Sequence, residues 1–288
     1  MTLKSIYKEK SSAFKISLIF LLILLSFIIT NLIGIGFSYI FFDQAISLAH
    51  DFSSKATVNS LKLLQSFTGI GLFVIPTLLY AYLTDFDLNI NTRFNLQIIL
   101  LSIAIILVIN PFISFLYEWN KSINFPSWML QYDVRAEEIT KAFLEMSNFK
   151  DLIINLFIIG FIPAIGEELF FRGYLQKSFY KWVSNPHLAI FITAFLFSAI
   201  HMQFQGFLPR FVLGALLGYM FYWSSSIWVP IIAHFINNTV AVIFLYPSLS
   251  KYNLVTSTEA SSNAVIFSIT AVGVLLFLLE KKRNDISV

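Results

Sequence analysis

Residues 151–176 read DLIINLFIIGFIPAIGEELFFRGYLQ, an apolar run that contains two adjacent glutamates and an arginine. The run is long enough to cross a membrane as a helix, because about 20 apolar residues span a hydrocarbon layer of about 30 Å. Ionisable groups at that depth are costly, about 3 kcal/mol each on insertion scales, and are usually functional. Glu167, Glu168 and Arg172 therefore indicate both a membrane helix and a functional site within it.

The whole chain has the composition of a polytopic membrane protein. Of its 288 residues, 57% are hydrophobic and 12% are charged, and its mean hydropathy is +0.77. A soluble domain would carry about 25% charged residues. We therefore predict an all-α, polytopic transmembrane helical bundle with about eight spans. The expected spans are 14–42, 62–83, 97–117, 151–181, 187–205, 207–223, 227–246 and 264–279.

The chain is expected to form one membrane-embedded domain over residues 1–288, with a motif-bearing core at about 150–246. No repeat of fixed period and no low-complexity segment divides it. Basic residues flank the first and last runs, so the positive-inside rule places both termini of this multi-pass cell-membrane protein in the cytoplasm. The first run is expected to be retained as a signal anchor. The flanking residues are Lys4, Lys8, Lys10, Lys15, Lys281, Lys282 and Arg283.

The charge pattern argues against nucleic acid as a partner. The net charge of +3 arises from the basic flanks, and no basic stripe interleaved with aromatic residues occurs. The chain contains no cysteine, so disulfides and thiolate chemistry are absent.

A polar segment, residues 118–150, interrupts the apolar runs. Its residues Ala136, Ile139, Phe143 and Met146 follow the 3,4,3 spacing of an amphipathic helix. Such a helix either lies flat on the bilayer surface or covers a site as a lid or substrate guide.

Two glycines, Gly214 and Gly218, form a small-xxx-small pattern in the run 207–223. This pattern lets helix backbones approach closely. We expect the two glycines to pack against other helices within the bundle. The alternative is that they lie at a dimer interface.

The charged residues of the run 151–176 are not equivalent. Residues four apart share a helix face, so Glu168 and Arg172 are expected to pair along their own helix. Glu167 is turned about 100° from Glu168 and has no partner in its helix. Glu167 is therefore the carboxylate expected to do chemistry.

Counting residues from the nearest turn locates a partner for Glu167. The tripeptide Ser184-Asn185-Pro186 predicts a turn, because Asn-Pro favours turn initiation and Pro opens a helix. Glu167 lies 17 residues before Ser184 and His201 lies 17 after it. In an antiparallel hairpin both lie roughly 25 Å from the turn. We therefore expect Glu167 and His201 to lie side by side.

Two further polar residues reach a similar depth. Residues 224–226 predict a turn on the same side of the membrane, and Asn238 lies roughly 20 Å beyond it. His234 is one helical turn before Asn238 on the same face. One buried cavity is therefore predicted to contain Glu167, His201, His234 and Asn238.

This set of side chains has two chemical interpretations. A carboxylate beside an imidazole in a site of low dielectric can take a proton from water, and a second imidazole with an amide can donate to the oxyanion formed at an attacked carbonyl. Alternatively, Glu167, His201 and His234 bind a divalent metal such as zinc, with an open position for water. The residues alone leave both interpretations open.

Motifs of several other intramembrane and hydrolase families do not occur in the sequence. These are His-Glu-x-x-His, Gly-x-Ser-x-Gly and Gly-x-Gly-Asp. The motifs present are Glu-Glu-x-x-x-Arg (Glu167, Glu168, Arg172), Phe-x-x-x-His (Phe197, His201) and His-x-x-x-Asn (His234, Asn238).

In this order and on successive helices, these motifs resemble those of the CAAX-protease and bacteriocin-processing (CPBP) family of intramembrane proteases, which includes the eukaryotic Ras-converting endopeptidase. The resemblance covers about residues 150–246. It implies an intramembrane endopeptidase in which Glu167 and His201 activate water. His234 and Asn238 would hold the oxyanion or complete a metal site, and Glu168 and Arg172 would shape the site. Phe197 would pack against His201.

Two other functions fit the same buried polar residues. Chains of Glu and His also form proton relays in proton-coupled transporters, although no inverted repeat is detectable. A non-catalytic membrane scaffold or immunity factor would bind a partner through the bundle. The partners expected for an endopeptidase are membrane lipid and a membrane-tethered peptide or protein, which the resemblance allows to be a prenylated C-terminus, a leader peptide or another membrane protein.

Overall fold

The structure is a computed structural model that describes residues 3–42, 52, 54–90, 95–246 and 260–286. These residues form helices joined by short connections, and no β-strand occurs among them. The predicted all-α class is confirmed. The single domain expected over residues 1–288 includes segments 43–51, 91–94 and 247–259, which lie outside the described residues.

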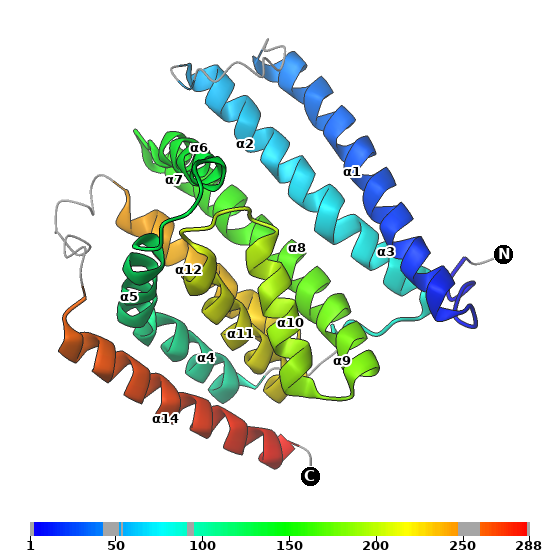
Figure 1. Ribbon diagram of the computed structural model, residues 1–288. Coiled ribbons are helices and arrows are strands. Elements are labelled where there is room, and N and C mark those ends of the chain that lie inside the picture. The colour runs from blue at the N-terminus through cyan, green and yellow to red at the C-terminus, as the bar shows by residue number, and fades with distance from the viewer. Residues whose placement is uncertain (1–2, 43–51, 53, 91–94, 247–259, 287–288) are drawn as a thin grey trace.

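Two long helices form an antiparallel pair along one side of the bundle (Figure 1). One is α1 (Ser12–Phe42), and the other is continuous over 30 residues, Lys55–Thr84. Gly71 lets the two helices approach closely, because a Cβ atom there would lie 2.0 Å from Oγ1 of Thr30 in α1. The second helix comprises α2 (Lys55–Gly69), η1 (Ile70–Val74) and α3 (Ile75–Thr84).

The glutamate-bearing helix is continuous over 35 residues, Phe149–Val183. The η segments of this helix and of Lys55–Thr84 are π-helical turns, in which each backbone amide donates to the carbonyl five residues back, one further than in an α-helix. Pro76 follows η1 and Pro163 follows η2. Each of these two wider turns therefore lies just before a proline, which has no N–H to donate and whose ring crowds the carbonyl four residues back. The helix comprises α7 (Phe149–Asn155), η2 (Leu156–Phe161), α8 (Ile162–Glu168), η3 (Leu169–Gln176) and α9 (Lys177–Val183).

The other helices surround the glutamate-bearing helix. In Figure 1, α10, α11 and α12 lie at the centre of the bundle beside α8 and α9, and α14 runs along the side away from α1. α4 and α5 are bent by 43° relative to each other, next to Pro111. The bounds are α4 (Leu96–Val108), α5 (Asn110–Lys121), α6 (Ser127–Leu144), α10 (Pro186–Ala199), α11 (Phe207–Ser224), α12 (Trp228–Phe244) and α14 (Ser262–Ile286).

By length and composition, fewer than the eight expected spans are identified among the described helices. Four described helices are long and apolar enough to cross a membrane, and the bent pair α4–α5 makes five if it counts as one span. α10 and α12 are apolar but have only 14 and 17 residues, which is about 21 and 26 Å of helix. The four long helices are α1, Lys55–Thr84, Phe149–Val183 and Ser262–Arg283.

The predicted turn after the glutamate-bearing helix is confirmed. Ser184 ends α9 in the left-handed region, with φ 52°. The side chain of Asn185 accepts hydrogen bonds from two backbone amides at the start of α10. This N-cap satisfies amides that have no partner within the helix.

The expected helix over residues 187–205 is wrong at its far end. α10 stops at Ala199, and residues 200–206 form a loop. Met202 adopts a left-handed φ of 51°, which a continuing right-handed helix does not allow. His201 is therefore a loop residue just beyond α10.

Glycines let α11 approach its neighbours. A Cβ atom on Gly214 would lie 3.1 Å from Phe197 of α10, and one on Gly218 would lie 2.9 Å from Ile190 of α10. The carbonyl of Gly214 also accepts a hydrogen bond from Arg172 of η3. The two glycines thus pack inside the bundle, as expected from their spacing.

Candidate active site

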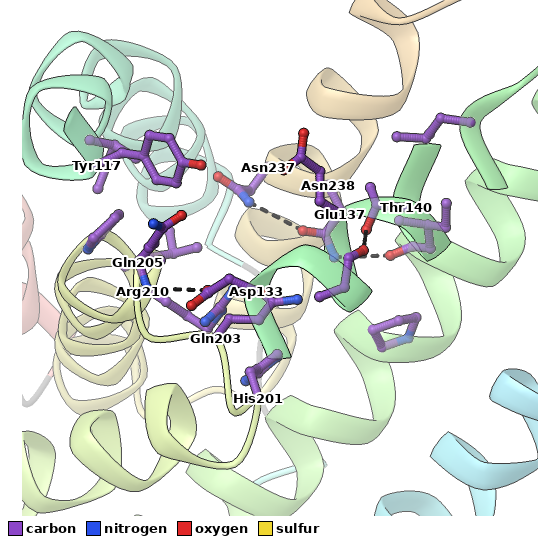
Figure 2. A pocket seen from close by; sticks show the side chains of 18 of the residues that line it. Tyr117, Asp133, Glu137, Thr140, His201, Gln203, Gln205, Arg210, Asn237 and Asn238 are labelled. Atoms are coloured by element: carbon purple, nitrogen blue, oxygen red, sulfur yellow. Dashed lines mark hydrogen bonds between the residues drawn. The ribbon is translucent and has the colours of Figure 1, made fainter. Parts of the chain in front are cut away.

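A cavity of about 810 Å³ lies among the central helices, and all four residues predicted to form the site line it. Glu167 comes from α8, His201 from the loop after α10, and His234 and Asn238 from α12. Figure 2 shows His201 and Asn238 with polar side chains from other walls of the cavity. The fold thus brings these four residues to one place.

Glu168 and Arg172 form a buried ion pair, as their spacing predicts. Arg172 Nη1 donates to Glu168 Oε1 at 2.8 Å, and both side chains are fully buried. The same oxygen accepts a hydrogen bond from Nδ1 of His234, also at 2.8 Å. This second contact joins the glutamate-bearing helix to α12 and was not predicted from the sequence.

Phe197 packs against both histidines and the arginine. The Arg172 guanidinium lies 4.7 Å from the centroid of its ring, a cation–π contact. The rings of His201 and His234 meet it edge-on, with centroids 5.3 and 6.0 Å away. The expected packing of Phe197 against His201 is confirmed.

Hydrogen bonds determine which nitrogen of each imidazole is left for chemistry. Nδ1 of His201 lies 2.7 Å from the backbone oxygen of Phe197. A carbonyl oxygen only accepts, so His201 carries a proton on Nδ1, and Nε2 is an acceptor in the neutral ring. The carboxylate of Glu168 likewise accepts a hydrogen bond from Nδ1–H of His234. In both rings Nε2 is the nitrogen left for a ligand.

Glu167 has a different environment from its neighbour Glu168. It is partly exposed, lines the cavity and makes no hydrogen bond or ion pair with another residue in the described part of the chain. The sequence predicted that Glu167 and His201 lie side by side. The structure places them on the walls of one cavity without a direct hydrogen bond, so Glu167 is free to interact with a ligand.

The amide of Asn238 is oriented by two neighbours. Its Nδ2 donates to the carbonyl oxygen of Ile159 at 3.0 Å, and its Oδ1 accepts from Nδ2 of Asn237 at 3.2 Å (Figure 2). An amide nitrogen has two protons. One N–H of Asn238 therefore remains for a ligand.

A metal site at Glu167, His201 and His234 is not supported. Within the described ranges, no group of three His, Asp or Glu side chains is arranged to hold a metal ion. We derive no step that requires a metal.

One wall of the cavity is formed by α6, which belongs to the polar segment 118–150. Oδ1 of Asp133 accepts a hydrogen bond from the backbone amide of Gln205, in the loop that carries His201, at 3.2 Å. Phe143 and Met146 of the predicted apolar stripe are buried. This placement favours a cover or substrate guide over a helix that only lies on the bilayer. The lining residues of α6 are Asp133, Ala136, Glu137, Thr140, Lys141 and Leu144.

Sequence reasoning missed Arg210, Asn237 and Asp133, which also line the cavity. For Arg210 a signal was available. It is the one charged residue in the apolar run 207–223, and the argument that selected Glu167 applies equally to it.

The four predicted site residues lie in a region of the chain that matches a known family. Residues 149–240 match the family model described as "Type II CAAX prenyl endopeptidase Rce1-like". The match begins in α7 and ends in α12, so it contains every motif residue of the site. Over these residues the chain is similar to the Rce1-like family of type II CAAX prenyl endopeptidases. This match confirms the resemblance seen in the motifs.

Curated bacterial proteins are similar to part of this chain at low identity. The "Uncharacterized protein YpbD" of Bacillus subtilis (strain 168) is 28% identical over 95 residues, 32% of this chain and 46% of that protein. The "Putative membrane peptidase YdiL" of the same organism is 27% identical over 118 residues, 41% of this chain and 47% of that protein. An "Uncharacterized 24.3 kDa protein" of Escherichia coli is 30% identical over 112 residues, 37% and 50% of the two chains. The chain thus spans about half the length of the curated relatives it matches, and no solved structure matches it.

Proposed function

We propose that the protein is an intramembrane endopeptidase that hydrolyses a peptide bond of a membrane-tethered or lipid-modified substrate with an activated water. The observation that carries this proposal is the meeting of Glu167, His201, His234 and Asn238 in one cavity within the family-matched region. A carboxylate, two imidazoles and an amide supply the base and the hydrogen-bond donors that hydrolysis of an amide needs.

Glu167 and His201 are the proposed water-activating pair. Glu167 has no partner among the described residues, and Nε2 of neutral His201 is an acceptor. Two acceptors orient the two protons of a water molecule and turn its lone pair toward the substrate carbonyl. Glu167 takes one proton as the oxygen adds to the carbonyl carbon. It then returns that proton to the amine nitrogen as the C–N bond breaks.

His234 and Asn238 are proposed to hold the oxyanion. The free N–H of Asn238 is one donor. Nε2 of His234 is a donor when the ring carries both protons, and Glu168 fixes that ring through Nδ1. Removing one such donor from a hydrolase costs about 10²–10³ in kcat.

The proposed topology has eight spans with both termini in the cytoplasm. Besides the four or five long spans, it includes α10, α11 and α12, which are short for a bilayer of about 30 Å. Short spans are accommodated by local thinning of the bilayer. The basic residues around the start of α1 and at the end of the span Ser262–Arg283 support the orientation.

Comparing membrane-protein termini in cells that carry different variants tests the proposal. Glu167→Gln preserves the shape of the base but cannot accept the proton, so we expect cleavage to fall at least 100-fold, within the usual range for loss of general-base catalysis. His201→Ala is expected to do the same. Glu138→Gln is the matched control, because Glu138 is an exposed carboxylate of α6 that pairs with Arg135.

The outcomes separate the three functional classes. Retained cleavage in Glu167→Gln would contradict the proposal. Full complementation of a deletion by Glu167→Gln would favour a scaffold or immunity factor. Proton-driven solute flux in proteoliposomes would favour a transporter.

A further inference from the structure

Arg210 is a cation of the cavity that the proposed hydrolysis does not use. It lies in the first turn of α11 and lines the same cavity as Glu167 and His201. Figure 2 shows its side chain beside Gln203 and Asp133. An arginine in this position needs a physical explanation, because a guanidinium stays charged and is costly to bury.

Only some of the hydrogen-bond donors of the Arg210 guanidinium have a partner among the described residues. Nη2 donates to Oε1 of Gln203. Nη1 is buried and has no hydrogen-bond partner within the part of the chain that the structure describes. No described carboxylate lies within ion-pair distance of it. Glu167 and Asp133 are the acids whose charges act on it at longer range.

The loop that carries His201 leaves room for this guanidinium. A Cβ atom on Gly206 would lie 3.3 Å from Nη2 and 3.6 Å from Nη1 of Arg210. The guanidinium therefore packs on the bare backbone of the loop, close in the chain to His201. Its place is set by the same segment that sets the proposed catalytic imidazole.

The other cations near the site already have partners. Arg172 donates to Glu168 and to the carbonyl of Gly214. Lys141, the second cation of the cavity wall, lies 2.7 Å from Glu137. This contact lowers the pKa of the Glu137 carboxyl and raises the pKa of Lys141. Arg210 is thus the cation of the described cavity wall that has no ion-pair partner.

A carboxylate from a ligand would complete this site. A planar guanidinium binds a carboxylate through two parallel hydrogen bonds, and a guanidinium is more easily desolvated than an ammonium. We propose that Arg210 binds a carboxylate of the substrate, either the C-terminal carboxylate or an acidic side chain. Arg210 would then determine where the substrate sits relative to Glu167. This inference deepens the proposed peptidase function and rests on it.

The test measures peptide binding separately from cleavage, using the full chain in nanodiscs with Glu167→Gln as background. The probe is a dye-labelled peptide that ends in farnesyl-Cys, two aliphatic residues and Ser, with one Asp before the Cys. It is made with a free C-terminus, with a C-terminal amide, and with that Asp replaced by Asn. Fluorescence anisotropy gives the three dissociation constants, with empty nanodiscs as blank.

We expect one of the two neutralised peptides to bind at least tenfold more weakly than the parent peptide. The amide form reports on the C-terminal carboxylate, and the Asn form reports on the acidic side chain. Adding Arg210→Gln should weaken binding of the parent peptide by the same factor. The parent and the neutralised peptide should then bind with equal affinity. Arg210→Lys keeps the charge but not the planar guanidinium, so an intermediate affinity is expected. This variant replaces Arg210→Gln in the test if Arg210→Gln does not fold.

Two matched variants separate the charge of Arg210 from its surroundings. Lys141→Gln removes the other cation of the cavity wall, and Gln203→Ala removes the hydrogen-bond partner but leaves the charge. Both should keep the preference for the carboxylate. Equal affinities for the three peptides, no binding, or a preference that survives Arg210→Gln would overturn the inference. Failure of the wild type to cleave a peptide that it binds with this preference would instead count against the peptidase function.

Discussion

At the scale of residues, two adjacent glutamates have opposite environments. Glu168 is fully buried and shared between Arg172 and His234, whereas Glu167 faces the cavity without a partner among the described residues. The pair of Glu168 with Arg172 was predictable, because residues four apart meet on a helix. The contact with His234 was not, since 66 residues separate the two and no local spacing rule extends that far.

This division predicts different effects on stability for the same substitution at the two glutamates. Glu168→Gln leaves the buried Arg172 guanidinium without its counter-charge, and breaking a buried ion pair in this way costs about 3–5 kcal/mol. Glu167→Gln removes a carboxylate that has no ion pair, so we expect little loss. Thermal unfolding of both variants in the same detergent compares them. Equal melting temperatures would show that Glu168 does not stabilise Arg172.

At the scale of elements, turns were predicted better than helix lengths. Ser184 and Asn185 have local turn and cap chemistry that the sequence reveals. The end of α10 at Ala199 is set by the loop 200–206, which is held by Asp133 of α6 and by Asn120 of α5. Contacts of this kind come from elements distant in the sequence. The apolar run 187–205 therefore appeared to be one helix.

The close packing of α10 on α11 gives a prediction at the same scale. A methyl group on Gly218 would lie 2.9 Å from both Ile190 and Gln176, and overpacking of this kind costs about 1–3 kcal/mol. Gly36 in α1 has no atom within 4 Å of the position of its Cβ, so Gly36→Ala should be neutral or stabilising by up to about 1 kcal/mol. Thermal unfolding in detergent measures both. A Gly218→Ala protein as stable as Gly36→Ala would contradict the described packing.

At the scale of the whole molecule, the helical class predicted from the sequence is confirmed, and the eight spans stay a prediction. Composition alone requires a membrane bundle. Counting apolar residues gave eight spans because it treats every apolar run as a lipid-exposed helix. Here the site helices α10 and α12 are short, and residues of α12 such as Ala233 and His234 pack against other helices instead of lipid. Length and composition therefore identify only the longer helices as spans.

Single cysteines would decide the topology, because the chain contains no cysteine of its own. Lys4→Cys, Lys121→Cys and Lys282→Cys are labelled with a membrane-impermeant maleimide in intact and in permeabilised cells. With eight spans, three lie between Lys4 and Lys121 and five between Lys121 and Lys282. Only Lys121→Cys should then react in intact cells. If the five long spans alone cross the membrane, Lys121→Cys and Lys282→Cys both react in intact cells. If α4–α5 does not cross either, all three need permeabilisation.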